Sequence, residues 1–468
     1  MREKIHLFYT NDLHSNFDHW PRVATYMKTE RAKKEAENKS CWLVDVGDHV
    51  DRVNPIAEAF MGKANVVLMN DLGYDFATIG NNEGITMAHE DLYELYDEAR
   101  FKVVCTNLSS QRHQEPDWLH SSVQITSIQG VKVGMLGLTV PFNAFYHLLD
   151  WHVEPAFEAL EKNLLQLKET SDVIILLSHL GINEDRAIAE RFPEIDVIIG
   201  GHTHHLLRSG ERVNDTIITA AGKHCAFVGE VVLTWDHHQQ KLVHKEAYTT
   251  NITHLAKDLE TEQKLLAFET EAKHILGETV ATINKPLDVN WFKTTDIMQQ
   301  LTNTLTTWTE ADCGMLNAGL LLERFEKGHI TYEDIHRICP HPINPCVVKL
   351  NGDELIEVVR ASLTKDFMEL NLKGFGFRGE VIGRMVFAKL NIETDIHKNG
   401  QEYVRSVTLN NQPIQSDQTY TVATADTFTF GRLLPEIAKS KTKQYFLPEF
   451  IRDLLAHTLR QHYEMKIK

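Results

Sequence analysis

The 468-residue chain holds no long apolar run of the kind that crosses a membrane. No uncharged stretch of about 18 residues or more occurs in it. Residues 1–8 lead straight into an expected strand, without the apolar stretch of about 7–15 residues and the cleavage site of a signal peptide. Cysteine is also scarce: six in 468 residues, several inside apolar runs, indicate core residues rather than a disulfide framework. These absences predict a cytoplasmic protein without a membrane partner.

Positive charge is in short supply as well. The chain has 48 Lys and Arg residues against 65 Asp and Glu, for a net charge of −17. Surfaces for nucleic-acid polymers or anionic membranes normally need basic patches, so the composition argues against both. A Gly-x-Ser-x-Gly elbow and a Gly-x-x-x-x-Gly-Lys-Ser/Thr loop are also missing. Neither a serine nucleophile of that type nor a nucleoside-triphosphate cradle is therefore expected.

Side chains of the types that bind metal ions, by contrast, follow five short apolar runs in the first 205 residues. Each run is β-branched or aromatic, is bounded by Gly or Asp, and is predicted to form a buried strand. Ligands at strand ends converge on one rim of a sheet, so distant segments can build one site. The runs are 5–9, 41–46, 76–79, 173–177 and 197–199, followed by Asp12-Leu13-His14, Gly47-Asp48, Gly80-Asn81-Asn82-Glu83, Ser178-His179 and Gly200-Gly201-His202-Thr203-His204.

The candidate ligands are oxygen donors and imidazoles without cysteine, a combination that suits Mn, Zn, Fe or Co. One open catalytic metal takes three or four protein ligands, so seven candidates favour two divalent ions, with Asp48 as the natural bridge. Taken singly, each residue could instead cap a helix or shape a turn, and it is their joint recurrence that favours a dinuclear centre. The candidates are Asp12, His14, Asp48, Asn81, His179, His202 and His204.

The order of these motifs resembles that of the calcineurin-like metallophosphoesterases, and with its C-terminal half the whole chain is similar to the 5′-nucleotidase family. The resemblance implies a phosphoester hydrolase in which a hydroxide that bridges two metal ions attacks phosphorus. It implies a nucleotide or nucleotide-like substrate. It also implies that one ion is held by Asp12, His14, Asp48 and His204, and the other by Asp48, Asn81, His179 and His202.

One departure from the family lies beside Asn81. Family members usually have His-Glu after Gly-Asn and an Asp two residues further on, and this His–Asp pair stabilises the transition state or assists the leaving group. Here Asn82 and Ile85 occupy those positions. An amide cannot release a proton near neutral pH, and general-acid help is typically worth about 10²–10⁴ in rate. Asn82 is therefore a candidate catalytic residue by position alone.

Two consequences stay open. The substrate could carry a leaving group that needs little help, such as a phosphoanhydride, an aryl phosphate or a cyclic phosphodiester. Alternatively, another group near the motif ends supplies the proton or the positive charge. The candidates are His49, Arg52, His205 and His224.

Apolar strands alternate with helical segments such as 21–36 and 155–168 until about residue 205, and consecutive strands follow in 216–236. This pattern predicts a layered α/β or α+β fold. With the resemblance, we expect a four-layered metallophosphoesterase β-sandwich flanked by helices and a smaller α+β C-terminal domain. The predicted division is 1–255 for the first domain, 256–280 for a linker helix and 281–468 for a 5′-nucleotidase-like substrate-binding domain.

Two C-terminal stretches, 312–319 and 420–426, resemble nucleotidase C-terminal domains, and Asn317 is retained as a candidate substrate-binding residue. An expected substrate-binding Arg is replaced by Leu322. Aromatic residues beside glycines could still clamp a base, although spacing by two also allows them to face a core, the interpretation we slightly favour. These candidates are Phe375, Phe377, Phe428 and Phe430, with Arg378 and Arg432 beside them for phosphate or solvent.

The leading hypothesis is thus a dinuclear metal-dependent phosphohydrolase whose partner is a small phosphate ester. The competing hypothesis is a metal-binding sensory or binding protein that has lost efficient turnover together with the His–Asp pair.

Overall fold

The computed structural model describes residues 1–397, 402–431 and 433–463. The chain divides into two compact units, Met1–Ala272 and Lys273–Lys468, and the division falls inside helix α9 (Leu259–Leu276). No helix among the described residues is long and apolar enough to cross a membrane. All six cysteines are free thiols, and five of them are buried.

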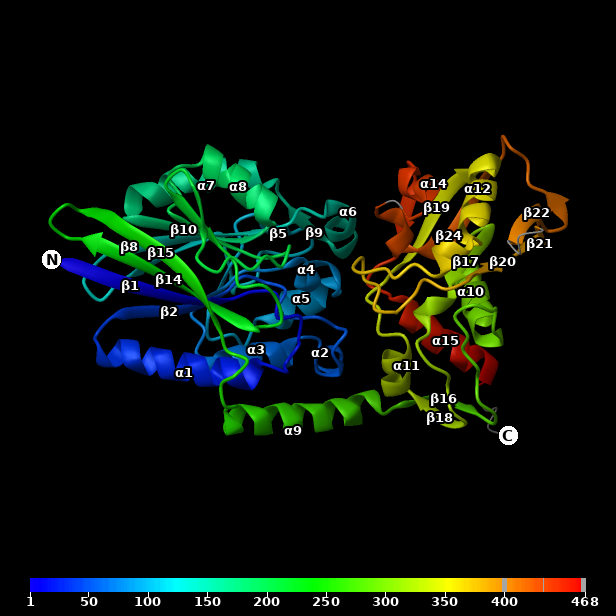
Figure 1. Ribbon diagram of the computed structural model, residues 1–468, viewed down its shortest axis with the longest axis horizontal. Coiled ribbons are helices and arrows are strands. Elements are labelled where there is room, and N and C mark those ends of the chain that lie inside the picture. Colours follow the sequence, from blue (N-terminus) through cyan, green and yellow to red (C-terminus); the bar gives the residue numbers. More distant parts are fainter. Residues whose placement is uncertain (398–401, 432, 464–468) are drawn as a thin grey trace. The chain divides into compact units, whose positions relative to one another are not determined.

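The first unit contains two large sheets (Figure 1). The seven-stranded sheet has the order β15 (Lys241–Asn251), β14 (Phe227–Asp236), β1 (Arg2–Thr10), β2 (Ser40–Asp45), β3 (Phe76–Ala77), β4 (Lys102–Val104) and β6 (Leu119–His120). The six-stranded sheet has the order β12 (Glu211–Val213), β13 (Thr216–Thr219), β11 (Val197–Gly200), β10 (Val173–His179), β8 (Lys132–Thr139) and β7 (Ser122–Thr126). A short pair, β5 (Leu108–Ser110) and β9 (Trp151–Val153), lies apart from both sheets in the pairing order.

The two sheets bury alternate side chains against each other. Ile5 and Leu7 of β1 share one buried cluster with Ile175 and Leu177 of β10. On the outer face of the six-stranded sheet, a second cluster joins the strands to α7 and α8, and α1 lies along the other sheet (Figure 1). These layers confirm the predicted four-layered sandwich. The helices are α1 (Trp20–Ala36), α2 (Pro55–Ala59), α3 (Lys63–Leu72), α4 (Asn81–Ile85), α5 (His89–Leu95), α6 (Asn143–Tyr146), α7 (Ala156–Thr170) and α8 (Ile182–Arg191).

The five expected strands are present as β1, β2, β3, β10 and β11. Strand β3 is shorter than predicted, because its neighbour β2 ends at Asp45, whose carbonyl oxygen accepts the last bond of this ladder from Thr78 N at 3.0 Å. Strands β1, β2 and β3 are mutually parallel, as are β10 and β11. The carboxyl ends of β1, β2 and β3 therefore lie at one edge of their sheet, and those of β10 and β11 lie at one edge of theirs.

The second unit is built on a five-stranded sheet with the order β20 (Met385–Ala388), β17 (Cys313–Asn317), β24 (Thr419–Ala425), β19 (Pro345–Asn351) and β25 (Lys443–Tyr445). Smaller sheets are formed by β21 (Leu390–Ile396), β22 (Glu402–Leu409) and β23 (Gln412–Pro413), and by β16 (Thr279–Ile283) and β18 (Gly328–Thr331). The helices are α10 (Asp296–Trp308), α11 (Tyr332–Ile338), α12 (Gly352–Ser362), α13 (Lys365–Met368), α14 (Pro435–Lys439) and α15 (Ile451–Tyr463). One continuous buried cluster fills this unit, as predicted for an α+β domain.

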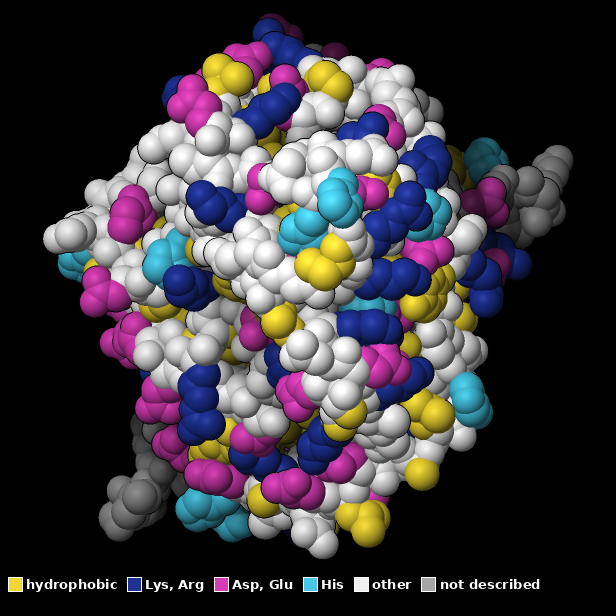
Figure 2. All heavy atoms as spheres, turned by 90° about the vertical axis from the view of Figure 1, so that its left-hand side faces the viewer, with side chains coloured by type: hydrophobic (Ala, Val, Ile, Leu, Met, Phe, Trp, Pro, Cys, Tyr) yellow, Lys and Arg dark blue, Asp and Glu magenta, His cyan; other side chains and the backbone are white. Residues whose placement is uncertain are grey.

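Figure 2 shows one face of the molecule, on which Lys and Arg side chains are interspersed with Asp and Glu. Neither sign of charge dominates this face, although the net charge of the chain is −17.

Candidate metal centre

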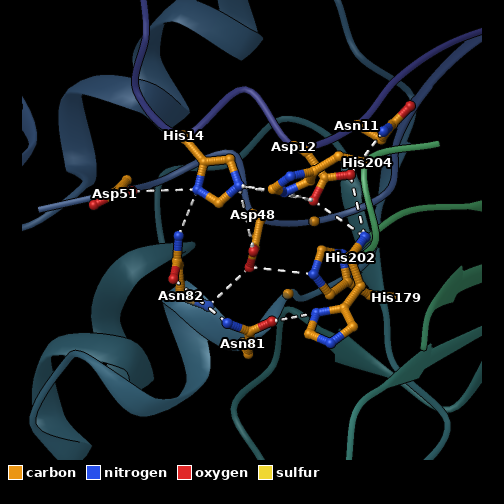
Figure 3. Close-up of polar contacts among 12 residues, drawn as sticks. Asn11, Asp12, His14, Asp48, Asp51, Asn81, Asn82, His179, His202 and His204 are labelled. Atoms are coloured by element: carbon orange, nitrogen blue, oxygen red, sulfur yellow. Dashed lines mark hydrogen bonds and ion pairs between the residues drawn. The ribbon is translucent and has the colours of Figure 1, made fainter. Parts of the chain in front are cut away.

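The loops that follow β1, β2, β3, β10 and β11 bring the seven predicted ligands together (Figure 3). Five of these residues have a positive φ: Asp12 (51°), His14 (53°), Asp48 (50°), His202 (69°) and His204 (56°). A left-handed backbone is uncommon for residues other than glycine and clusters at functional sites. The chain thus accepts local backbone strain where these side chains converge.

One half of the centre contains Asp12, His14 and His204. His14 Nε2 lies 3.0 Å from His204 Nε2, and His204 Nε2 lies 3.4 Å from Asp12 Oδ1. Asp12 is fully buried, and Asn11 Nδ2 donates to its Oδ2 at 2.7 Å. Two imidazole nitrogens and a buried carboxylate oxygen therefore face one another.

The other half contains Asn81, His179 and His202. His179 Nε2 lies 3.3 Å from Asp48 Oδ1, and His202 Nδ1 lies 2.8 Å from Asn81 Oδ1. The second oxygen of the same carboxylate, Asp48 Oδ2, lies 3.7 Å from His14 Nε2 in the first half. Asp48 thus stands between the two halves, with one oxygen toward each.

The chemistry of His179 tests whether this donor set fits a cation. Its ring is fully buried, and Nδ1 donates to the carbonyl oxygen of Val46 at 2.7 Å, while Nε2 has no hydrogen-bond partner among the described residues. Burial alone would lower the pKa of His179, but the charge of Asp48 outweighs it and raises that pKa to about 10. An imidazole nitrogen held toward a buried carboxylate in this way fits a metal ligand.

The chain matches the calcineurin-like phosphoesterase family over residues 5–206 and the 5′-nucleotidase C-terminal domain family over residues 276–432. It is 42% identical over 463 residues, 98% of this chain and 100% of the other, to the uncharacterized metallophosphoesterase YunD of Bacillus subtilis (strain 168). The chain belongs to the calcineurin-like metallophosphoesterases. It is therefore a hydrolase that acts on phosphoesters.

Two more distant proteins are similar to this metallophosphoesterase over most of its length. The trifunctional nucleotide phosphoesterase protein YfkN of Bacillus subtilis (strain 168) is 24% identical over 470 residues, 89% of this chain and 31% of that protein. The structure of Haemophilus influenzae NAD nucleotidase superposes with a TM-score of 0.68 at 16% identity, covering 99% of this chain and 97% of the other. The latter likeness confirms the two-domain fold.

Asn82, which by resemblance stands at the position of the family His, contacts the expected ligands directly. Its backbone N–H donates to Asp48 Oδ1 at 2.8 Å, and its side-chain Nδ2 lies 2.7 Å from His14 Nδ1. Asp51 Oδ2 lies 3.2 Å from the same nitrogen of His14. The amide and the carboxylate therefore orient the His14 ring from the side away from its Nε2.

Sequence reasoning missed the role of Glu83 in the metallophosphoesterase. This buried carboxylate accepts hydrogen bonds from the backbone N–H groups of Gly80 (3.0 Å), Asp48 (3.1 Å) and Val50 (2.8 Å). The two loops approach so closely that a Cβ on Gly47 would lie 2.4 Å from Gly80 N. A Glu three residues after Gly80, the spacing of a capping box, was the available sequence signal.

The four residues considered as substitutes for the family His–Asp pair lie in different surroundings. His49 is fully buried, and burial lowers its pKa to about 3. Arg52 donates to Glu58 at 2.8 Å, and His205 is exposed beside Thr203. The ring of His224 lies 6.0 Å from the ring of His14, edge to face, which makes it the candidate in contact with an expected ligand.

In the C-terminal unit, the predicted binding residues separate into buried and exposed sets. Asn317 is buried and donates to Ile382 O at 2.8 Å. Phe377 is buried and stacks on the ring of His341. Phe428 is fully buried in the core.

The interpretation that all four phenylalanines face a core is wrong for Phe375, whose residue surface is 48% exposed. Three consecutive residues, Gly374, Phe375 and Gly376, have positive φ and break the alternation of a strand. Phe375 stacks on the half-buried Phe430, with ring centroids 6.1 Å apart and planes 11° apart. Arg378 donates to Phe377 O at 3.3 Å, and Arg432 lies outside the described residues.

Proposed function

We propose that this metallophosphoesterase hydrolyses nucleotides or nucleotide-like phosphates with two divalent cations held by the seven converging residues. The observation that carries the proposal is the position of Asp48, whose Oδ2 lies 3.7 Å from His14 Nε2 and whose Oδ1 lies 3.3 Å from His179 Nε2. One ion would be held by Asp12, His14, Asp48 and His204, and the other by Asp48, Asn81, His179 and His202. The mixed nitrogen and oxygen donors suit Mn, Zn, Fe or Co.

When bound, such ions hold phosphate oxygens, neutralise the charge that develops at phosphorus and lower the pKa of an attacking water. The protein residues supply the geometry. The carbonyl oxygen of Val46 fixes the tautomer of His179, and Asp51 approaches Nδ1 of His14. Glu83 holds the loop of Asp48 against the loop of Asn81 through three backbone hydrogen bonds.

A nucleotide is the preferred substrate class. The names of two relatives, a nucleotide phosphoesterase and an NAD nucleotidase, support this choice. The exposed face of Phe375 beside Phe430 supports a stacking platform for a base. The six free thiols support the further proposal that the enzyme works in the cytoplasm.

Asn82 bears on which phosphate bond is cleaved. Its amide cannot release a proton, and it contacts His14. We therefore infer that the enzyme favours leaving groups that need little protonation: phosphoanhydrides, aryl phosphates and cyclic phosphodiesters over nucleoside 5′-monophosphates.

Purified protein should be assayed with Mn²⁺, Zn²⁺ and Co²⁺ against an aryl phosphate, a nucleoside monophosphate, a cyclic nucleotide and a pyrophosphate-linked nucleotide. Asp48→Asn should lose at least about 100-fold in rate, since even outer-shell changes cost about 10–100-fold at metal sites. Asp18→Asn, an exposed carboxylate four residues after His14, is the matched control and should keep its activity. No hydrolysis above buffer with any metal, or equal rates for wild type and Asp48→Asn, would favour a sensory or binding protein instead.

A further inference from the structure

A second group of metal-binding side chains lies at the start of α5, apart from the candidate centre. His89, Glu90 and His113 each offer one ligand atom, and these atoms all lie within 4.8 Å of one another. His89 Nδ1 and His113 Nε2 both lie 3.3 Å from Glu90 Oε1. We propose that these three residues form a separate binding site for a divalent cation of the zinc class.

The spacing of the ligand atoms carries this proposal. Zinc bonds to His nitrogen and carboxylate oxygen are about 2.0–2.2 Å long, so neighbouring ligand atoms of a tetrahedral site lie about 3.3–3.6 Å apart. Both nitrogen–oxygen distances to Glu90 are 3.3 Å, equal to that between His179 Nε2 and Asp48 Oδ1 in the candidate centre. Two His and one Glu are also a ligand set that zinc enzymes use.

The surroundings of His89 hold its ring in place for this role. The side chain is 2% exposed and stacks with Trp151, at 4.9 Å, and with Tyr93, at 5.6 Å. Its Nε2 lies 3.0 Å from Ser110 Oγ, so Nδ1 is the ring nitrogen that faces Glu90 and is left for a cation.

The solvent side of the group leaves room for further ligands. The side chains of Glu90 and His113 are 53% and 46% exposed, so water can complete the coordination. Arg112 Nη1 also lies 3.1 Å from Glu90 Oε1. The guanidinium therefore neutralises Glu90 in the metal-free protein, and a divalent ion has to displace it.

Bound metal would tie the segment between β5 and β6, which carries His113, to the first residue of α5. Residues 89 and 113 are far apart in sequence, and α5 follows α4, on which Asn81 and Asn82 lie. The site would thus stabilise the start of α5, which follows the segment of Asn81 and Asn82, without contributing a ligand to the candidate centre.

The test is the zinc content of the full-length protein after equilibration at a series of buffered free zinc concentrations. His113→Gln and Glu90→Gln should each hold one zinc ion fewer than wild type, with zinc affinity at this site reduced at least about 100-fold. Arg112→Gln should fill the site at lower free zinc, because the competing cation is gone. The exposed His254 provides the matched control, and His254→Gln should bind zinc as wild type does.

Cobalt absorption gives a second measurement: wild type loaded with Co²⁺ should show visible bands that are missing from His113→Gln. The phosphoesterase activity of His113→Gln should equal that of wild type, so a failure of the dinuclear proposal, seen with Asp48→Asn, is distinguishable from a failure of this one. Equal zinc content in wild type, His113→Gln and Glu90→Gln at every free zinc concentration would overturn the proposal. An equal loss of bound zinc in His113→Gln and His254→Gln would also overturn the proposal.

Discussion

Asn82 Nδ2 lies 2.7 Å from Nδ1 of His14, so the amide that by resemblance stands at the position of a family His contacts an expected metal ligand. If the amide limits leaving-group chemistry, Asn82→His combined with Ile85→Asp should raise the rate on a nucleoside monophosphate relative to an aryl phosphate. The expected gain in this ratio is up to about 10²–10⁴. Asn82→Gln keeps an amide and should leave the ratio near the wild-type value. An unchanged ratio in the double variant would show that position 82 does not set leaving-group preference.

Removal of Glu83 as an acceptor should loosen the two loops that it joins. Glu83→Gln keeps the size of the side chain but replaces one carboxylate oxygen with an NH2 group. At least one of the three buried backbone N–H groups that donate to Glu83 then loses its acceptor. Leaving a buried group unpaired costs about 1–3 kcal/mol, so the free energy of unfolding should fall by that amount, and metal affinity should fall with it. Urea unfolding and metal titration measure both effects. Glu94→Gln, which removes only an exposed pairing with Lys63, should change the free energy of unfolding by less than about 1 kcal/mol.

Chelation of the metals should lower thermal stability as well as activity. Ligands that bind the folded state alone add RT ln(1 + [L]/Kd), about 2.7 kcal/mol at 100 times Kd. The Tm should therefore rise with added Mn²⁺ or Zn²⁺ in wild type and rise much less in Asp48→Asn, as differential scanning fluorimetry can show. Equal metal-dependent shifts in the two proteins would mean that Asp48 is no ligand.

Phe375 should affect nucleotides but not simple aryl phosphates. Base stacking on an aromatic ring is worth about 1–3 kcal/mol per base, so Phe375→Ala should raise KM for nucleotides by about 5–150-fold. Steady-state kinetics with both substrate types measures the difference. Phe292, another phenylalanine that is 48% exposed in the same unit, is the matched control. Similar KM values for Phe375→Ala and Phe292→Ala would assign the base platform elsewhere.

Burial of Asp426 gives the second unit a pH-dependent stability. Burial raises the pKa of Asp426 to about 8, above the usual value of about 3.9 in an unfolded chain. Between these two pKa values the Asp426 carboxyl stays protonated in the folded state but is ionised in the unfolded chain. The free energy of unfolding therefore falls as pH rises from about 4 to about 8, by at most about 1.4 kcal/mol per pH unit. Unfolding by urea at pH 5 and pH 8 should show a larger loss in wild type than in Asp426→Asn. The same loss in both proteins would contradict the assignment.

Much of the candidate centre could be predicted because its signals are local. Val173 to Leu177 is a continuous apolar run followed closely by the candidate ligand His179, and a buried strand follows from that pattern alone. The close approach of the loops at Gly47 and Gly80 is different, since the role of Glu83 depends on how closely two segments approach in space. Phe375 was misassigned because alternation assumes extended backbone, whereas positive φ at three successive residues turns its ring outward. His89 and His113 belong to no shared sequence pattern, and packing on Trp151 brings the first of them into position.

The candidate centre draws its residues from the ends of strands in both large sheets. Asp12 and Asp48 follow strands of the seven-stranded sheet, whereas His179 ends a strand of the six-stranded sheet and His202 follows another. A pair of ions held by all four would act as an inorganic crosslink across the sandwich. Hydrogen exchange of β1 and β10 should then become slower together when metal is added, since neither sheet can open without breaking bonds to the other's ligands.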